Sequence, residues 1–228
     1  TNVTIPTTTN NPVIAASMVA GNVTLSSDAA LTITGALTNK GVTTLNSGAS
    51  LVSSTGTINS TVLYHRSLST NWHLVASPVI GETVENYNVK NTLATGGTGV
   101  NIALATYNNN WESPTVSGWA YKTTASTGLL TSGKGYATKR SAAGDITFTG
   151  TMPTTDVTIA ITDGLTNRFN LIGNPYPSYI PANSLADGSN AILKINGSTG
   201  TNQLSEDTIW FWDETTNSYT TVNSATSA

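Results

Sequence analysis

The chain contains no cysteine among its 228 residues. Disulfide bonds, thiolate nucleophiles and cysteine-ligated metal sites are therefore excluded together. Charge is scarce as well, because charged residues make up 9% of the chain against about 25% in an ordinary globular protein. The nine Lys and Arg residues are scattered and form no basic stripe. A nucleic-acid partner is not expected, since that interaction requires clustered cations that neutralise phosphates.

Long apolar runs are also missing, and no segment has the length needed to cross a bilayer, so membrane insertion is not expected. No secretory signal begins the chain, but a processed or excised segment would look the same. Histidine occurs only as His65 and His73, which leaves no third nitrogen for a typical zinc site. The Gly-x-Ser-x-Gly motif of acyl-transfer enzymes is missing too. The sequence therefore predicts no metal, no cofactor and no enzymatic activity.

The residues that are abundant indicate an extracellular all-β protein. Thr, Ser and Asn supply the polar surface in place of charges, and Thr is a good strand former. With 38% hydrophobic residues, the chain has enough apolar side chains to build a core, which argues against disorder. We therefore expect an all-β fold in a protein that is secreted or displayed on the cell surface.

The first part of the chain carries a repeat of about 20 residues. The segment NVTI at 2–5 returns as NVTL at 22–25 and, more loosely, as VTTL at 42–45. Stacked aliphatic residues at such a period are typical of a β-solenoid, in which each coil buries its inward side chains against the next coil. We predict a β-solenoid of about three coils over residues 1–63, with a meander of short hairpins as the alternative. The expected inward side chains are Ile5, Leu25, Leu45, Val13, Leu31 or Ile33, and Leu51.

Aromatic residues first appear just after residue 63, and this change of composition predicts a second region over residues 64–228. Short strands separated by Gly, Pro and Asn are typical of an antiparallel β-sandwich. One or two helical turns are expected at 181–186, where Pro stands near the first position. The expected strands are 72–76, 102–107, 118–122, 135–139, 145–149, 157–161, 169–172, 191–195 and 208–212.

This second region contains an internal duplication. Residues 72–78 read WHLVASP and residues 169–175 read FNLIGNP, which share an aromatic residue, a Leu, a β-branched residue and a final Pro. The first copy is expected over about 72–161, and an incomplete second copy over about 169–228. We therefore expect a piece of a longer polypeptide, with a strand edge that pairs with downstream residues or with a neighbouring molecule.

Several segments together resemble large secreted and surface proteins of Bacteroidota that are exported by the type 9 secretion system. The segments are the coils, WHLVASP at 72–78, GKGY at 133–136, TFTG at 147–150 and NLIGNPYPS at 170–178. The resemblance covers nearly the whole chain, and GNPYP is its most specific part. It implies an adhesin-like surface protein that contacts the secretion machinery during export, and it supplies no catalytic residues. The C-terminal sorting domain of such proteins is missing from this sequence.

Aromatic side chains are the candidate ligand-binding residues. Trp111, Trp119, Tyr121 and Trp212 are candidates to stack on glycans, because an aromatic face packs against the apolar face of a sugar ring. Core packing is the alternative role. Trp210 and Trp212 share one strand face by their spacing of two, and we expect both to be buried.

Other polar residues give weaker predictions. The tripeptide 207–209 reads Asp-Thr-Ile and resembles the pattern at which Bacteroidota O-glycosylate exported proteins, with Thr208 as the acceptor. A glycosidase needs two convergent carboxylates, whereas the acids beside aromatic residues, Glu112, Asp213 and Glu214, suit hairpin turns. Calcium binding needs a compact acidic loop. The remaining candidates for it are dispersed: Asp156, Asp163, Asp187 and Asp207.

We therefore expect a non-enzymatic structural or adhesive module of a secreted cell-surface bacterial protein, which self-associates into fibres or contacts a glycan or another surface target. The alternative is a carbohydrate-binding module of a polysaccharide-degrading enzyme whose catalytic part lies outside this segment. A lyase on the solenoid is a third alternative, although three coils leave little room for a groove. Exposed coplanar tryptophans would favour carbohydrate binding, and buried tryptophans would favour the structural role.

Overall fold

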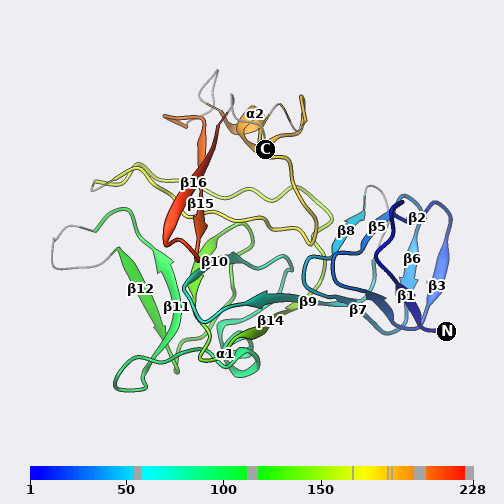
Figure 1. The fold of residues 1–228 in the computed structure, drawn as a ribbon, viewed down its shortest axis with the longest axis horizontal. Helices are drawn as coiled ribbons and strands as arrows, with labels where there is room; N and C mark the ends of the chain where they lie inside the picture. Colours follow the sequence, from blue (N-terminus) through cyan, green and yellow to red (C-terminus); the bar gives the residue numbers. More distant parts are fainter. Residues whose placement is uncertain are drawn as a thin grey trace. The chain divides into compact units, whose positions relative to one another are not determined.

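The computed structural model describes residues 1–53, 58–111, 118–165, 167–183, 185, 187–197 and 204–223. Strands dominate these residues, and two short helices accompany them, so the predicted all-β class is confirmed (Figure 1). The chain forms two compact units, Thr1–Ser178 and Tyr179–Ala228. Within the described ranges, no helix is both long and apolar enough to span a membrane.

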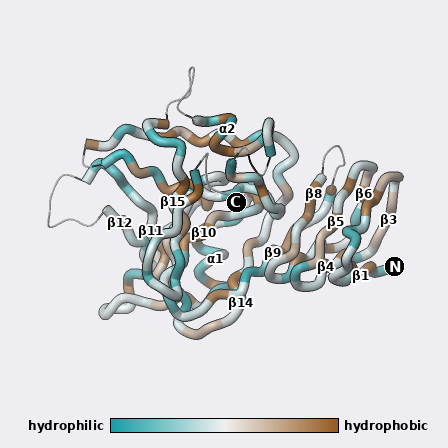
Figure 2. Tube along the Cα trace, turned by 45° about the horizontal axis from the view of Figure 1, so that its top comes forward, coloured by the Kyte–Doolittle hydropathy of each residue, from teal (hydrophilic) through white to brown (hydrophobic). Residues whose placement is uncertain are grey.

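The first unit begins with strands that pair in parallel at intervals of 20 residues. Ile5 lies opposite Leu25, and Leu25 lies opposite Leu45, as the repeat predicts. Leu25 and Leu45 are fully buried, and hydrophobic segments recur on successive strands of this N-terminal stack (Figure 2). The strands of the stack are β1 (Val3–Ile5), β4 (Val23–Leu25) and β7 (Val42–Leu45); β2 (Val13–Ile14), β5 (Ala30–Ile33) and β8 (Ser50–Ser53); and β3 (Met18–Ala20) with β6 (Leu37–Asn39).

One predicted inward position in this stack is wrong. Val13 is 58% exposed, whereas its neighbour Ile14 lies opposite the buried Ile33. Successive side chains of a strand point to opposite faces, so a shift of one residue exchanges the inward and outward sets. Leu31 and Leu51 are buried and lie opposite each other in the adjoining pair of strands, as expected.

Asparagine side chains connect the starts of successive strands in the stack. The Oδ1 atom of Asn2 accepts a hydrogen bond of 2.9 Å from the backbone N–H of Asn22. The Oδ1 atom of Asn22 in turn accepts a bond of 2.9 Å from the N–H of Val42. A shared turn follows the strands, because Asp28 and Gly48 both adopt the left-handed region, with φ of 59° and 82°. Side-chain bonds and turn geometry therefore hold the same register as the buried leucines.

Strand β9 (Thr61–Leu68) joins the N-terminal stack to the rest of the first unit. One edge of β9 pairs in parallel with β7, and the other edge pairs antiparallel with β14 (Gly144–Gly150). The predicted division at residue 63 falls inside this strand. A four-stranded antiparallel sheet follows in the order β10 (His73–Ala76), β13 (Gly135–Thr138), β11 (Asn101–Tyr107) and β12 (Trp119–Thr123).

Helix α1 (Val84–Asn91), which the sequence did not predict, packs against β14. Thr83 caps its first turn, because the Thr83 hydroxyl accepts a bond from the N–H of Asn86. Tyr87 is fully buried, with its ring centroid 5.1 Å from that of Phe148 and its hydroxyl bonded to Thr138 of β13. This burial raises the pKa of Tyr87. The helix therefore connects the mixed sheet to the four-stranded sheet through one aromatic side chain.

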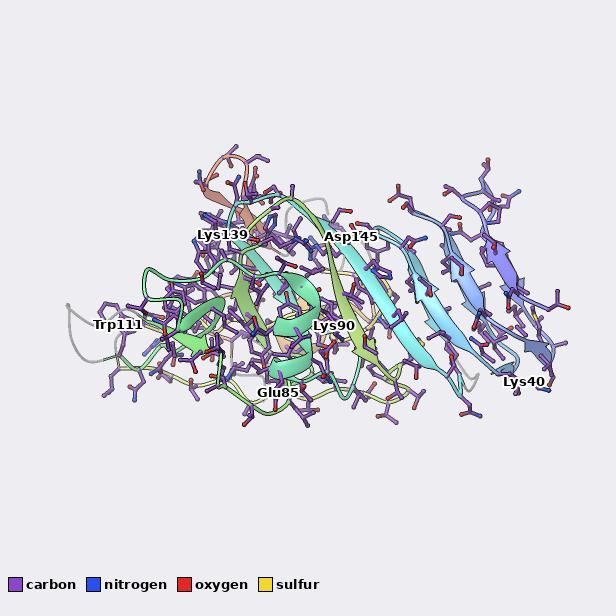
Figure 3. All side chains as sticks on the ribbon, turned by 90° about the horizontal axis from the view of Figure 1, so that it is seen from below. Lys40, Glu85, Lys90, Trp111, Lys139 and Asp145 are labelled. Atoms are coloured by element: carbon purple, nitrogen blue, oxygen red, sulfur yellow. The ribbon has the colours of Figure 1, made fainter. Side chains whose placement is uncertain are left out.

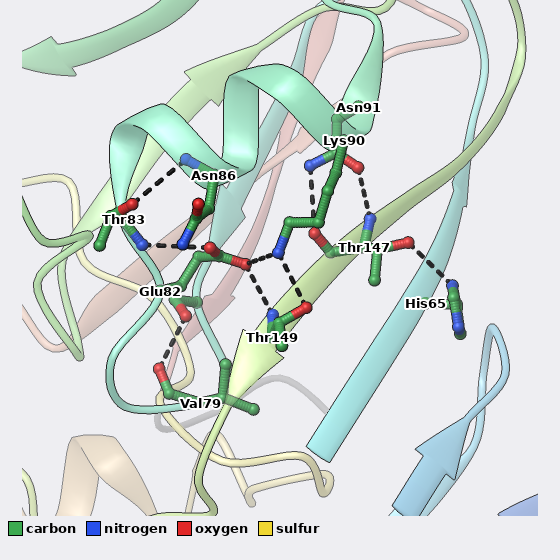
Figure 4. Close-up of polar contacts among 10 residues, drawn as sticks. His65, Val79, Glu82, Thr83, Asn86, Lys90, Asn91, Thr147 and Thr149 are labelled. Atoms are coloured by element: carbon green, nitrogen blue, oxygen red, sulfur yellow. Dashed lines mark hydrogen bonds and ion pairs between the residues drawn. The ribbon is translucent and has the colours of Figure 1, made fainter. Parts of the chain in front are cut away.

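A buried carboxylate fastens the start of α1 to β14 (Figure 4). Glu82 is fully buried and accepts bonds from the N–H of Thr149 at 2.6 Å and from Nζ of Lys90 at 2.7 Å. At the other end of the helix, Asn91 and Thr147 exchange two bonds between the Asn91 amide and the Thr147 backbone. These contacts satisfy the polar groups that the helix brings into the core.

The segment from 157 to 172 departs from the prediction. The expected strands 157–161 and 169–172 are not formed, although Ile172 makes an isolated bridge with Lys134. The carbonyl of Leu171 accepts a bond from the N–H of Gly135, so the segment lies beside the start of β13. The second sequence copy therefore differs in secondary structure from the first copy, whose residues His73–Ala76 form β10.

The second unit contains a short helix and a hairpin. Helix α2 (Ile192–Asn196) occupies the place of the strand predicted at 191–195. The described residues of the predicted helix, 181–183 and 185, are not helical, and residues 184 and 186 lie outside the described residues. Strands β15 (Thr208–Asp213) and β16 (Ser218–Asn223) pair antiparallel as a two-stranded sheet.

The turn of this hairpin makes a titration prediction. Bonds from the Thr215 hydroxyl and the Thr215 N–H lower the pKa of Asp213 to about 2. Because this pKa lies below the unfolded value of about 3.9, the stabilisation is complete above that value and is lost as the pH falls through the folded pKa. In the Thr215→Ala variant we expect the pKa of Asp213 to rise, as followed by NMR of its carboxyl carbon. An unchanged pKa would contradict this account.

Candidate functional site

One face of the four-stranded sheet carries small, buried side chains at its centre. Leu74 of β10 lies opposite Ala137 of β13, Ala137 opposite Ala105 of β11, and Ala105 opposite Tyr121 of β12. Residues directly opposite each other project from the same face of a sheet. The two central strands therefore contribute only methyl groups between the larger side chains of the outer strands.

Two aromatic rings meet above these alanines. Trp72 immediately precedes β10. The centroids of the Trp72 and Tyr121 rings lie 5.9 Å apart, with an angle of 63° between their planes. Trp72 lies just before β10 and Tyr121 lies in β12, which are the two outer strands of the sheet. Tyr121 remains 46% exposed.

A second aromatic group lies at the end of β11 and the start of β12. The Tyr107 and Trp119 rings are 5.2 Å apart and edge-to-face, with an angle of 61°. Trp111 packs against Gly118, where an added Cβ would lie 3.0 Å from both Trp111 Cδ1 and Tyr107 Cε2. Figure 3 shows Trp111 apart from the side chains of α1. We call Trp72, Tyr107, Trp111, Trp119 and Tyr121 the aromatic face.

The structure thus brings three of the four predicted aromatic candidates together: Trp111, Trp119 and Tyr121. Tyr107 and Trp72 were missed as site residues. The spacing of two residues in the sequence predicts that Tyr107 and Ala105 share a strand face. The position of Tyr107 beside Trp119 depends on the pairing of β11 with β12. Each of the two ring pairs joins a tryptophan to a tyrosine in an edge-to-face arrangement.

The fourth candidate, Trp212, lies in the second unit. Its ring packs edge-to-face on Tyr219, with centroids 5.1 Å apart. The expectation that Trp210 and Trp212 are both buried is wrong, because Trp210 is 36% exposed and Trp212 is only half-buried. Their hairpin is a two-stranded sheet, which offers less neighbouring surface than a layered core.

A hollow of about 360 Å³ adjoins the aromatic face at Tyr107. Its walls come from three stretches of the first unit: the end of β11, the turn before β13, and the segment 159–172. Phe169 forms an apolar wall and is 56% exposed. The lining residues are Tyr107, Asn108, Asn109, Thr131, Lys134, Ile159, Ala160, Thr162, Phe169, Asn170, Leu171 and Ile172.

Side-chain amides hold the irregular wall of this hollow in place. Asn109 donates to the carbonyl of Thr162 at 2.9 Å and accepts from the Thr162 hydroxyl at 3.0 Å. Asn170 accepts from the N–H of Thr162 at 3.0 Å and donates to its carbonyl at 2.9 Å. Asn167 donates to the Tyr107 hydroxyl at 2.7 Å. Side chains therefore hold the wall formed by segment 159–172 in place, although that segment forms no strand.

The remaining candidates are not gathered into one site. His73 is buried beside the Ser69 hydroxyl, and Nδ1 of His65 lies 3.0 Å from the Thr147 hydroxyl. Thr208 is half-buried in β15. Glu112 lies outside the described residues. Among the residues that the structure describes, no three His, Cys, Asp or Glu side chains are grouped to hold a metal ion.

Comparison with known proteins gives a family. No curated protein and no solved structure matches the chain significantly. Residues 1–226 match a family described as a domain of unknown function, DUF8693. Since the match spans nearly all 228 residues, the chain belongs to the DUF8693 family.

Proposed function

We propose that the chain is a non-enzymatic adhesive or structural module of a secreted cell-surface bacterial protein, and that the aromatic face is its contact surface. In this proposal the N-terminal stack is a β-solenoid of about three coils, and the later sheets form a sandwich-like body. The parallel register at 20-residue intervals supports a regular rod, because each repeat buries its leucines against the next. The aromatic face is the observation that carries the adhesive role.

Carbohydrate is the second candidate, and the same face favours it. The C–H groups on one side of a sugar ring pack on the electron-rich face of an aromatic ring. Tyr121 presents a partly exposed ring that Trp72 holds in place from the edge. The hollow beside Tyr107 adds hydroxyl groups and the Lys134 side chain at the same surface. This combination of fixed apolar rings and convergent polar groups is typical of small-ligand sites.

Retention on polysaccharide tests this proposal. We expect Tyr121→Ala and Trp119→Ala each to weaken binding to the cognate polysaccharide by about tenfold or more, because each removes stacking area. Affinity gel electrophoresis against a panel of plant and bacterial polysaccharides measures the effect. Circular dichroism shows whether each variant is folded.

Tyr179→Ala is the matched control, because it removes an exposed tyrosine outside the aromatic face. Its retention should equal that of the parent chain. If folded Tyr121→Ala and Trp119→Ala variants bind as tightly as the parent, the aromatic face is not the contact surface.

A further inference from the structure

The hollow beside Tyr107 has a distinctive charge. Lys134 is a cation, and no carboxylate belongs to the residues that line the hollow. The nearby Arg168 is engaged at 2.9 Å with Asp163, in an ion pair that is exposed to solvent. The lining of the hollow therefore includes one cationic residue and no carboxylate.

The apolar and polar groups of the hollow are arranged around this charge. Phe169 supplies an exposed ring, and Ile172 extends the apolar wall. The Tyr107 hydroxyl accepts a bond from Asn167 and can still donate its own proton. The amides of Asn109 and Asn170 are occupied with Thr162, so they hold the wall in place. A ligand in the hollow thus meets the Lys134 cation, the Phe169 ring and the Tyr107 hydroxyl.

The size of the hollow suits a small ligand. Its volume of about 360 Å³ lies near the lower end of the range of about 300–1,000 Å³ for small-molecule sites. A sugar ring satisfies the apolar wall through its C–H face and the Tyr107 hydroxyl through its own hydroxyls. A carboxylate on that ring would balance Lys134 through a charge-assisted hydrogen bond.

We propose that this hollow binds an acidic sugar, a hexuronic acid unit of a polysaccharide, with its carboxylate at Lys134 and its ring against Phe169. The inference rests on the proposed carbohydrate-binding role and names the class of sugar. The aromatic face then contacts neighbouring sugar units of the same polysaccharide, because Tyr107 belongs both to that face and to the hollow.

Trisaccharides of galacturonate, glucuronate and mannuronate, each compared with its methyl ester, test the inference by isothermal titration calorimetry. Methyl esterification removes the charge and keeps the ring. We expect at least one acid to bind about tenfold more tightly than its ester, with an affinity that falls as salt is added. Lys134→Met should remove this preference while leaving the weaker binding of the ester. Lys40→Met, in the N-terminal stack, is the matched control and should bind like the parent chain.

Equal binding of acids and esters would overturn the acidic-sugar inference, as would an undiminished preference in folded Lys134→Met. Failure of all the acids to bind would overturn it too. The proposed function is judged separately, by retention of Tyr121→Ala and Trp119→Ala on polysaccharide. If the aromatic face binds a neutral polysaccharide and the hollow binds none of the acids, the proposed function is supported and the acidic-sugar inference is overturned.

Discussion

Replacing Leu45 with aspartate is expected to lower the free energy of unfolding of the first unit by about 4 kcal/mol or more. Leu45 is fully buried in β7 and stacks on Leu25 of the preceding repeat. Leu45→Asp removes the buried methyl groups and places a carboxylate where no partner awaits it. Urea denaturation followed by circular dichroism measures the loss.

Thr38→Asp is the matched control for this substitution. Thr38 is exposed in β6 of the same stack, so the new carboxylate faces water. Its effect is expected within about 1 kcal/mol. Similar unfolding midpoints for Leu45→Asp and the parent chain would mean that the inward register of the stack is wrong.

Glu82→Ala is expected to have the second large effect, about 3 kcal/mol of lost stability. The substitution leaves the N–H of Thr149 without its acceptor and leaves Lys90 without its 2.7 Å carboxylate partner. Lys90 keeps partial solvent contact, since its side chain is 30% exposed. The main cost therefore falls on the buried groups around β14.

Two comparisons test this interpretation. Glu85→Ala, on the exposed side of the same helix, should change stability by less than about 1 kcal/mol. A double-mutant cycle of Glu82→Ala with Lys90→Ala should show a favourable coupling energy. Additive effects of the two substitutions would show that the ion pair does not couple them.

The register of the N-terminal strands was predictable because the same sequence pattern recurs in successive repeats. Each copy places an aliphatic residue at the same step, and parallel pairing aligns those residues directly. The position of Val13 was not predictable in the same way, because Val13 and Ile14 are adjacent aliphatic residues and either could face inward.

Secondary structure outside the N-terminal stack depends on tertiary contacts that no local sequence pattern predicts. Helix α1 has eight residues and weak local signals, and it forms where Tyr87 is buried and Glu82 fixes its start. The segment 191–195 is a short apolar run, which suits a helix or a strand equally well, and it folds as part of α2. At 157–161 the alternating pattern suggested a strand, but no strand forms there.

The candidate site also combines features that are predictable from the local sequence with features that depend on tertiary contacts. Residue type identified Trp111, Trp119 and Tyr121, because large aromatic side chains in a Thr-rich chain with few charges are suitable contacts for sugars. Their grouping with Trp72 depends on the order of four strands. The hollow requires residues from 107 to 172 to meet through the bonds between Asn109 and Thr162, and these bonds leave no periodic trace in the sequence.

The N-terminal stack also determines how its own length can be changed. Each repeat of 19 or 20 residues adds strands in parallel register, and neighbouring strands lie about 4.8 Å apart. Inserting or deleting one whole repeat would therefore move the first strand by about 4.8 Å while β9 keeps its pairing with β14. The length of the stack can therefore be changed in steps of one whole repeat.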